Sequence, residues 1–195
     1  MSELTQEILD RFQAGFDRAK AANVPEANAM TLATVDAEGR PAARTVLLKG
    51  YDPQGFVFYT NLGSRKGQHL ANTPEAALVF WWRETEEQVL IDGSVEPVST
   101  EEADAYFASR PRGSQIGAWA SRQSTQLADR DALLAAVAET EARFEGQEVP
   151  RPEHWSGFRI KPRRVEFWYG RTYRLHERVC YTLENNQWVQ TLLFP

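Results

Sequence analysis

Two adjacent cations, Arg65 and Lys66, stand where the sequence predicts the first turn of a helix. Ser64, directly before them, is a typical N-cap residue, because its hydroxyl can accept a hydrogen bond from a free backbone N–H group. Positive charges in a first helical turn oppose the helix dipole and are locally unfavourable. A bound anion would remove that conflict, since the N–H groups, the dipole and both cations would all attract it. The pattern therefore points to an anion site, and phosphate is the obvious candidate.

Further polar side chains occur beside predicted turns. A second group of anion-binding donors could comprise Lys49, Arg110, Arg112 and Ser114. Amide and hydroxyl groups that could bind a polar heterocycle are those of Gln88, Gln123 and Ser124. Arg174, His176 and Arg178 occupy alternate positions, so a strand would place all three on one face. Each of these residues, taken alone, is more often a solvated surface residue, so only their combination suggests a site.

The composition argues against several classes of protein and site. The 195 residues are 42% hydrophobic and 25% charged, which is ordinary for a globular protein. A net charge of -5 argues against a general nucleic-acid binder. The sequence has no G-x-G-x-x-G, no phosphate-binding G-x-x-x-x-G-K-[ST] loop and no H-E-x-x-H. The three histidines do not cluster with Cys or paired acids at metal-ligand spacing, so no metal site is predicted.

Cysteine content and hydropathy indicate the cellular compartment in which the protein is expected. A single cysteine, Cys180, excludes an internal disulfide and suits a reducing environment. No apolar run is long enough to span a membrane. The N-terminus mixes acidic and apolar residues and lacks the basic-then-apolar layout of a signal peptide. We therefore expect a cytoplasmic protein with no membrane partner.

The elements that must position these residues follow from periodicity and turn signals. Helices are expected over residues 3–22, 64–72, 99–109, 115–120 and 129–144. Strands are expected over residues 30–35, 42–49, 56–60, 76–82, 88–98, 155–160, 165–169, 179–184 and 187–194. Residues 44–49 and 56–60 should pair as a hairpin around the turn at 52–55. The helix at 129–144 should turn Leu133, Leu134, Val137 and Phe144 inward.

The order of these elements predicts the fold class. No β-α-β alternation appears, so the sheet should be antiparallel and should close as a barrel. We expect one mostly β domain over residues 1–195 with flanking helices. These include an N-terminal helix within residues 1–25 and a long helix within residues 129–146.

Four segments of the chain read RTVLLK, FYTNLGSRKGQHL, SRPRGSQIGAWASRQS and FRIKPRRVEFWYGRTYRLHER. Together they closely resemble the pyridoxamine 5′-phosphate oxidase family. The resemblance runs from about residue 30 to residue 188, in the family's order and spacing. The family fold is an FMN-binding split β-barrel with the flavin at a homodimer interface. The resemblance therefore implies this fold, FMN as the cofactor and a homodimer as the assembly.

The resemblance also implies roles for individual residues. The implied FMN contacts within one subunit are Arg44, Thr45, Val46, Leu47, Leu48, Lys49, Tyr59, Thr60, Arg65, Lys66 and Gln88. Contacts expected to reach FMN from the other subunit are Gln123, Ser124, Trp168 and Arg178. The substrate phosphate is assigned to Lys49, Tyr106, Arg110 and Ser114. Arg174 and His176 are assigned to the pyridine ring as the catalytic pair. Two phosphorylated ligands would account for two cationic groups, because arginine can bind phosphate oxygens bidentately.

The implied reaction is the oxidation of pyridoxamine 5′-phosphate or pyridoxine 5′-phosphate by oxygen, giving pyridoxal 5′-phosphate and hydrogen peroxide. One alternative is oxidation of another small cyclic substrate on the same barrel, such as a phenazine precursor. A second is a non-enzymatic flavin or pyridoxal-phosphate binder. The resemblance departs at both ends, since the basic, tyrosine-containing arm of the family is lacking before the first helix and the chain ends LLFP. We therefore expect closure over the substrate to differ from the family's.

Overall fold

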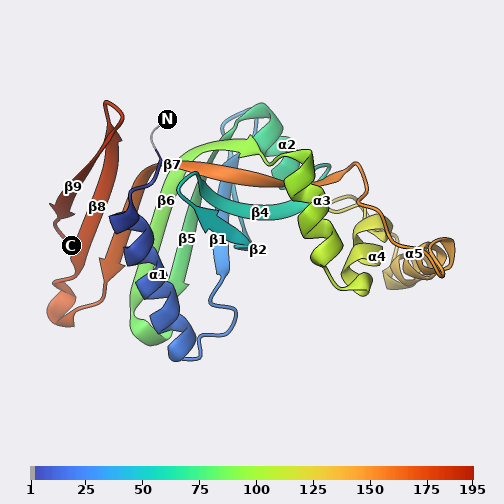
Figure 1. Ribbon diagram of the computed structural model, residues 1–195, viewed down its shortest axis with the longest axis horizontal. Helices are drawn as coiled ribbons and strands as arrows, with labels where there is room; N and C mark the ends of the chain where they lie inside the picture. The colour runs from blue at the N-terminus through green and yellow to red at the C-terminus, as the bar shows by residue number, and fades with distance from the viewer. Residues whose placement is uncertain (1–2) are drawn as a thin grey trace.

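The computed structural model describes residues 3–195, and its centre is one antiparallel sheet (Figure 1). Nine strands within this range form the sheet: β1 Ala29–Val35, β2 Pro41–Leu47, β3 Gly50–Asp52, β4 Gly55–Asn61, β5 Glu75–Trp82, β6 Glu87–Pro97, β7 Trp155–Tyr169, β8 Glu177–Glu184 and β9 Gln187–Leu193. The flanking helices are α1 Gln6–Ala21, α2 Arg65–Asn72, α3 Thr100–Ser109, α4 Arg112–Ala120 and α5 Arg130–Arg143, with 3₁₀ turns η1 Arg83–Thr85 and η2 Thr172–Arg174. Residues 1 and 2 of the predicted N-terminal segment lie outside the described residues.

The sheet curls into a split barrel, as the sequence predicts. Its main path runs β2-β1-β5-β6-β7-β4-β3, and the β8–β9 hairpin extends it from β7. The two end strands, β2 and β3, are joined in sequence by only Leu48 and Lys49, so the two edges of the path must come together. The Lys49 amide donates to the Val57 carbonyl of β4 at 2.9 Å and ties this junction to the opposite edge.

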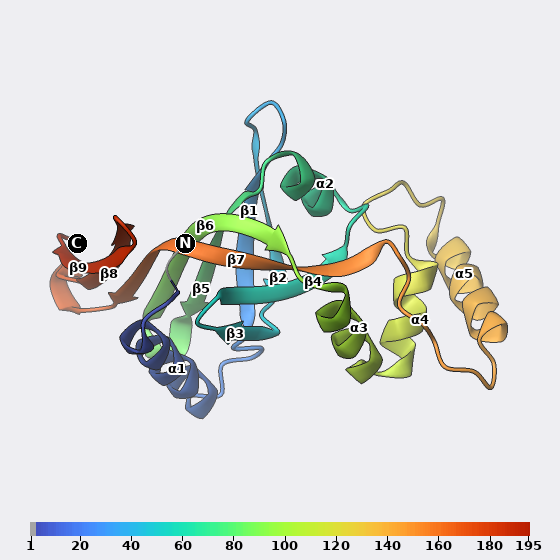
Figure 2. The same cartoon turned by 45° about the horizontal axis from the view of Figure 1, so that its top comes forward.

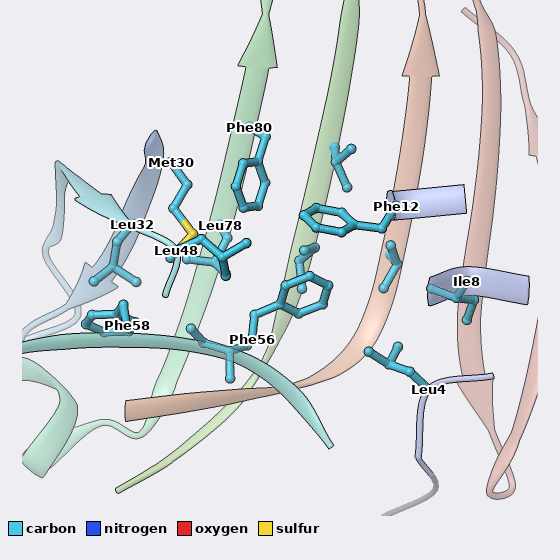
Figure 3. Packing of buried hydrophobic residues seen from close by; sticks show 14 of the residues in the cluster. Leu4, Ile8, Phe12, Met30, Leu32, Leu48, Phe56, Phe58, Leu78 and Phe80 are labelled. Atoms are coloured by element: carbon cyan, nitrogen blue, oxygen red, sulfur yellow. The ribbon is translucent and has the colours of Figure 1, made fainter. Parts of the chain in front are cut away.

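The barrel encloses an apolar core that α1 covers (Figure 3). Phe12 of α1 is fully buried, and its ring meets Phe56, Phe80 and Tyr51 edge-on at centroid distances of 5.0, 5.3 and 4.8 Å. Edge-to-face contacts of this kind suit aromatic quadrupoles. The predicted amphipathic helix is thus present, and its apolar face completes the barrel core rather than forming a ligand site.

Two predicted strand arrangements are wrong in detail. The first strand of the hairpin around residues 52–55 is β3, whereas residues 44–47 belong to β2 and pair with β1. The strand is interrupted at Leu48 and Lys49, so the apolar run is divided between β2 and β3, which lie at the two edges of the curled sheet. The segments 155–160 and 165–169 are one continuous strand, β7, which accommodates a register shift opposite Asp92 and Gly93 in β6.

Helix boundaries follow the capping residues. The side chains of Ser64, Ser99 and Asp129 accept the first free N–H groups of α2, α3 and α5, as their types predict. Helix α4 begins at Arg112, three residues before the start expected at residue 115. The expectation that Leu134 points inward is wrong, since it is 52% exposed. Helix α5 packs on α4 beyond the end of the barrel, and none of its residues Arg130–Arg143 is buried.

The two ends of the molecule differ. Helices α3, α4 and α5 lie beyond one end of the sheet, and the β8–β9 hairpin lies at the opposite end (Figures 1 and 2). The long strand β7 reaches both ends, pairing with β4 through Trp155 and with β8 through Tyr169. This separation divides the candidate site residues into two groups.

Candidate functional site

A cavity of about 600 Å³ opens among β2, β4, α2, α3 and α4 and gathers most of the predicted phosphate-binding residues. Its lining residues are Arg44, Thr45, Val46, Leu47, Lys49, Tyr59, Thr60, Asn61, Lys66, Tyr106, Ser109, Arg110, Pro111, Ser114, Ser121, Gln123 and Trp155. We call this cavity the cationic pocket. Leu48, expected among the cofactor contacts, is instead 5% exposed and belongs to the barrel core.

The start of α2 forms one wall of the cationic pocket. Ser64 caps the helix by accepting from the Gly67 amide at 3.3 Å. A side chain at Gly67 would place its Cβ 2.2 Å from the Leu62 carbonyl oxygen, so only glycine lets the helix start this close to the end of β4. The amides of a first helical turn have no partner within the helix and carry partial positive charge. This wall therefore has the backbone geometry of an anion site.

Three cations at this wall face one another without an acidic partner. None of the ion pairs in residues 3–195 includes Arg44, Arg65 or Lys66. Burial, and then the nearby charge of Arg65, lowers the pKa of Arg44. Burial, and then the charge of Arg44, lowers the pKa of Lys66. The cluster is thus electrostatically unfavourable as it stands, and a polyanion would relieve it.

Neutral oxygens hold the Lys66 ammonium in place. Its Nζ donates to Gln123 Oε1 at 2.8 Å, Thr60 Oγ1 at 3.2 Å and Ser64 Oγ at 3.3 Å. Gln123 therefore lies in the same chain's pocket, which differs from the expectation that it arrives from the other subunit. The segment carrying Gln123 can reach the pocket because Asn61 Nδ2 donates to the Ser121 carbonyl at 3.2 Å. Ser124, with φ at 72°, follows Gln123 but does not line the pocket.

Aromatic rings form the floor of the pocket. Tyr59 stacks on Tyr106 at 4.0 Å and 13°, and on Trp155 at 5.3 Å and 5°. Gly157 lies opposite Tyr59 in the β4–β7 pair, and a Cβ there would come within 2.7 Å of the tyrosine ring. Burial, and then the charge of Glu102, raises the pKa of Tyr59 to about 12, so its hydroxyl stays protonated as a hydrogen-bond donor.

Arg110 is held over this floor without an acidic partner. Its guanidinium carbon lies 4.6 Å from the centre of the Trp155 ring, and its Nη1 atom is buried with no hydrogen-bond partner in residues 3–195. Burial lowers the pKa of Arg110. A buried, unpaired donor beside Lys49 and Ser114 in one cavity suits an anionic ligand group. Arg112 is different, because it donates to the Phe144 and Gln147 carbonyls and does not line the pocket.

A second group of predicted residues forms a ladder across β6, β7 and β8. Gln88 pairs with Trp168, and Trp168 pairs with Arg178, so the three side chains share one face of the sheet. Arg178 Nε donates to Glu166 at 2.6 Å and Nη1 donates to the Phe194 carbonyl at 2.9 Å. Trp81 of β5 continues the row, with its ring 5.9 Å from that of Trp168.

Arg174 and His176 lie next to this ladder, but not on a strand. The expectation that Arg174, His176 and Arg178 alternate along one strand is wrong, because β8 begins at Glu177. Arg174 ends the 3₁₀ turn η2, with a φ of 62°, and is exposed. The His176 ring lies 4.4 Å from the Trp168 ring. Its Nδ1 atom accepts from the Arg171 amide at 3.2 Å, which leaves Nε2 to carry the ring N–H.

Some lining residues carried no signal in the sequence. Asn61, Ser109, Ser121 and Trp155 border the pocket only because β4, α3, α4 and β7 converge there. Asn61 could have been suspected from its place between a strand end and the Ser64 cap. In residues 3–195 no group of three His, Cys, Asp or Glu side chains could hold a metal ion. No helix in the described part of the chain is long and apolar enough to cross a membrane.

Together, the fold and the pocket define an antiparallel split-barrel protein built to hold anionic ligands. Comparison with known families makes this class specific. One family model, described as Pyridoxamine 5′-phosphate oxidase, matches residues 16–144. A second, described as the Pyridoxine 5′-phosphate oxidase C-terminal dimerisation region, matches residues 155–195. The chain belongs to the pyridoxamine 5′-phosphate oxidase family.

Individual relatives agree with this assignment. The chain is 54% identical over 194 residues to the pyridoxine/pyridoxamine 5′-phosphate oxidase of Acaryochloris marina, covering all of this chain and 89% of the relative. It is also 54% identical over 199 residues to that of Xanthomonas euvesicatoria, covering both chains fully. Among solved structures, PhzG from Burkholderia lata, in complex with tetrahydrophenazine-1-carboxylic acid, matches with a TM-score of 0.90 and 36% identity over 97% of this chain and 91% of that one. An FMN-binding protein from Nostoc punctiforme, at 18% identity, has the same fold with a TM-score of 0.76, each chain being fully covered.

Proposed function

We propose that this protein is an FMN-dependent oxidase that converts pyridoxamine 5′-phosphate or pyridoxine 5′-phosphate to pyridoxal 5′-phosphate, with oxygen as the acceptor and hydrogen peroxide as a product. Family membership supports the reaction and the cofactor. The observation that carries the proposal for this chain is the cationic pocket, where the buried Lys66 and the half-buried Arg44 and Arg110 have no acidic partners. A phosphorylated cofactor and a phosphorylated substrate would supply the missing negative charge.

The residues at the start of α2 fit the phosphate of FMN. Arg44, Arg65 and the α2 amides would bind phosphate oxygens, and Lys66 would contribute charge while Thr60 and Gln123 hold it in place. The backbone of residues 45–47 and of Lys49 would line the isoalloxazine side of the pocket. FMN, when bound, supplies the hydride acceptor and the reactivity toward oxygen, which no side chain can supply. The chain's own contribution is to bind, orient and exclude water.

The residues farther along the pocket fit the substrate phosphate. Arg110, with its unpaired Nη1 atom, would bind the phosphate together with Lys49 and Ser114, and the hydroxyl of Tyr106 would donate to it. Arg174 and His176 would then lie over the pyridine ring. The Nε2–H of His176 is a fixed donor for that ring, because Nδ1 is already occupied by the Arg171 amide. Binding the phosphate in this way would hold the reacting carbon against the flavin.

We further propose that residues 1–195 act as one domain and that two copies form a homodimer with FMN at their interface. The arrangement of the two residue groups supports this. Helices α3 and α4, which border the cationic pocket, and strand β8, which carries Arg178, lie toward opposite ends of one chain (Figure 1). A second copy could bring its ladder, with Arg174 and His176, to the pocket of the first. The match to a dimerisation region over residues 155–195 agrees with such an assembly. The free, buried Cys180 suits a reducing, cytoplasmic location, which is part of the same proposal.

Oxygen consumption on addition of pyridoxamine 5′-phosphate to the FMN-loaded protein tests the reaction. We expect peroxide and pyridoxal 5′-phosphate in equal amounts, together with a dimeric mass by light scattering. The structural similarity to PhzG favours one second candidate, oxidation of a phenazine precursor. A protein that oxidises a dihydrophenazine carboxylate and leaves pyridoxamine 5′-phosphate untouched would establish that candidate instead. Flavin binding without oxidation of either substrate would make it a non-enzymatic binder.

A further inference from the structure

A buried polar chain behind the cationic pocket has no part in the site described so far. Thr34 of β1 and His69 of α2 are only 2% and 6% exposed. The Thr34 hydroxyl lies 3.1 Å from Nδ1 of His69 and accepts a hydrogen bond from Nη1 of Arg44 at 2.7 Å. Burying polar side chains costs free energy unless they are hydrogen-bonded. The hydrogen bonds that link Thr34 to His69 and to Arg44 reduce this cost, and they connect the buried pair to a cation of the pocket.

The strand register explains how Arg44 reaches this chain. Arg44 of β2 pairs with Leu32 of β1, and Thr34 lies two residues farther along β1 on the same face. The same Nη1 atom of Arg44 also donates to the Leu32 carbonyl at 3.1 Å. Two acceptors on β1 therefore fix one nitrogen of the guanidinium, which leaves Nε and Nη2 for other partners.

Chemistry sets the direction of one of these two hydrogen bonds. Arginine can only donate, so Thr34 accepts from Arg44 through one of its two oxygen lone pairs. The other contact joins the Thr34 hydroxyl to Nδ1 of His69, and the tautomer of His69 determines which of the two atoms donates. With either tautomer, His69 fixes the rotation of the hydroxyl so that a lone pair faces Arg44. Neither Thr34 nor His69 is an acid, so the charge of Arg44 is held in position without being neutralised.

We propose that Thr34 and His69 are positioning residues that hold Arg44 toward the anion bound at the start of α2. His69 lies in α2, whose first turn carries Arg65 and Lys66. One helix would therefore supply both the amides that bind the anion and the side chain that supports Arg44 through Thr34. Arg44 and Lys66, from the first turn of α2, both line the cationic pocket, so Arg44 and the helix start converge on one place. This inference rests on the proposed function, because it takes the FMN phosphate as the anion.

A double-mutant cycle on FMN affinity tests the proposal. The dissociation constant of FMN is measured by flavin fluorescence for the wild type, Thr34→Val, Arg44→Ala and the double variant. A hydrogen bond contributes about 0.5–1.5 kcal/mol net, so Thr34→Val should weaken FMN binding roughly two- to twelvefold. In the Arg44→Ala background the same substitution should change affinity by less than about twofold, because the residue it supports is gone. Equal weakening in both backgrounds would overturn the proposal.

Substitutions at His69 give an independent comparison that does not depend on Thr34→Val folding. His69→Leu removes the hydrogen-bond partner of Thr34 and should weaken FMN binding as Thr34→Val does. His69→Asn offers an amide that can accept or donate near the position of Nδ1 and should retain wild-type affinity. Thr34→Ser, which keeps the hydroxyl, should also bind normally. If the His69→Leu and His69→Asn proteins bind FMN with the same affinity, whether high or low, the hydrogen bond between Thr34 and His69 does not position Arg44. A wild-type protein that fails to bind FMN would instead refute the proposed function itself.

Discussion

Replacing Arg110 with methionine should weaken substrate binding and stabilise the protein at the same time. The Nη1 atom of Arg110 is buried and unpaired, and an unsatisfied buried donor costs about 1–3 kcal/mol. The cation–π contact with Trp155 at 4.6 Å offsets roughly 0.5–2 kcal/mol of that penalty. Methionine keeps an apolar, flexible chain against the indole and buries no charge. We therefore expect Arg110→Met to stabilise the substrate-free protein by about 1 kcal/mol.

The same substitution should raise KM and leave kcat nearly unchanged. Each charge-assisted hydrogen bond to the substrate phosphate contributes about 1.5–3 kcal/mol, so KM for pyridoxamine 5′-phosphate should rise roughly 10- to 150-fold. Phosphate binding is similar in the ground and transition states, so kcat at saturation should change little. Differential scanning calorimetry of the FMN-loaded protein should show Tm higher by about 2–4 °C, the shift that 1 kcal/mol produces in a chain of this size.

Arg112→Met provides the matched control. Arg112 lies two residues away but donates to the Phe144 and Gln147 carbonyls at 2.7 and 2.8 Å, outside the pocket. Its loss should lower Tm and leave KM within about twofold of the wild type. The reasoning would be refuted if Arg110→Met lowered Tm while KM stayed unchanged, because Arg110 would then be a structural cation and not a ligand for the substrate.

Three further predictions concern the flavin phosphate, the ring-binding residues and acid stability. Arg65→Ala with Lys66→Ala should weaken FMN binding by several kcal/mol, since each charged hydrogen bond contributes about 1.5–3 kcal/mol; an unchanged affinity in a fluorescence titration would contradict this. Arg174→Ala should lower kcat as well as raise KM, because charge shifts at the pyridine ring during oxidation; an effect on KM alone in steady-state kinetics would make Arg174 a binding residue only. Burial by itself would raise the pKa of Glu166, but hydrogen bonds from Arg178 and Arg164 outweigh it and lower that pKa below 4.5. The ion pairs therefore stabilise the protein above pH 4.5 and lose their effect as the pH falls through the lowered pKa, so Glu166→Gln should destabilise at pH 7 and progressively less in more acidic urea titrations.

Local chemistry in the sequence was sufficient to locate the start of α2 and most turns. Ser64, Ser99 and Asp129 cap their helices as their types predict, because capping involves only residues within about one turn. The last turn follows the same logic, with Asn185 and Asn186 at φ values of 49° and 64°. The family resemblance added which scattered cations belong together, and the cationic pocket gathers most of those assigned to it in one chain.

Only the tertiary structure decided which strands pair and what supports the cations. The run around residues 44–49 is one apolar stretch in the sequence, yet β2 pairs with β1 and β3 pairs with β4, because the curled sheet needs a break at Leu48 and Lys49 to bring its two edges together. Alternation along a strand was a poor guide to Arg174 and His176, because β8 begins after them. Thr34 and His69 gave no sign of their contact, since 35 positions separate them and a hydrogen bond across that interval depends on how β1 and α2 pack. Capping and turn preferences depend on interactions between residues that are neighbours in the sequence. Strand register, burial and the pairing of distant polar groups depend on interactions that form only in the complete fold.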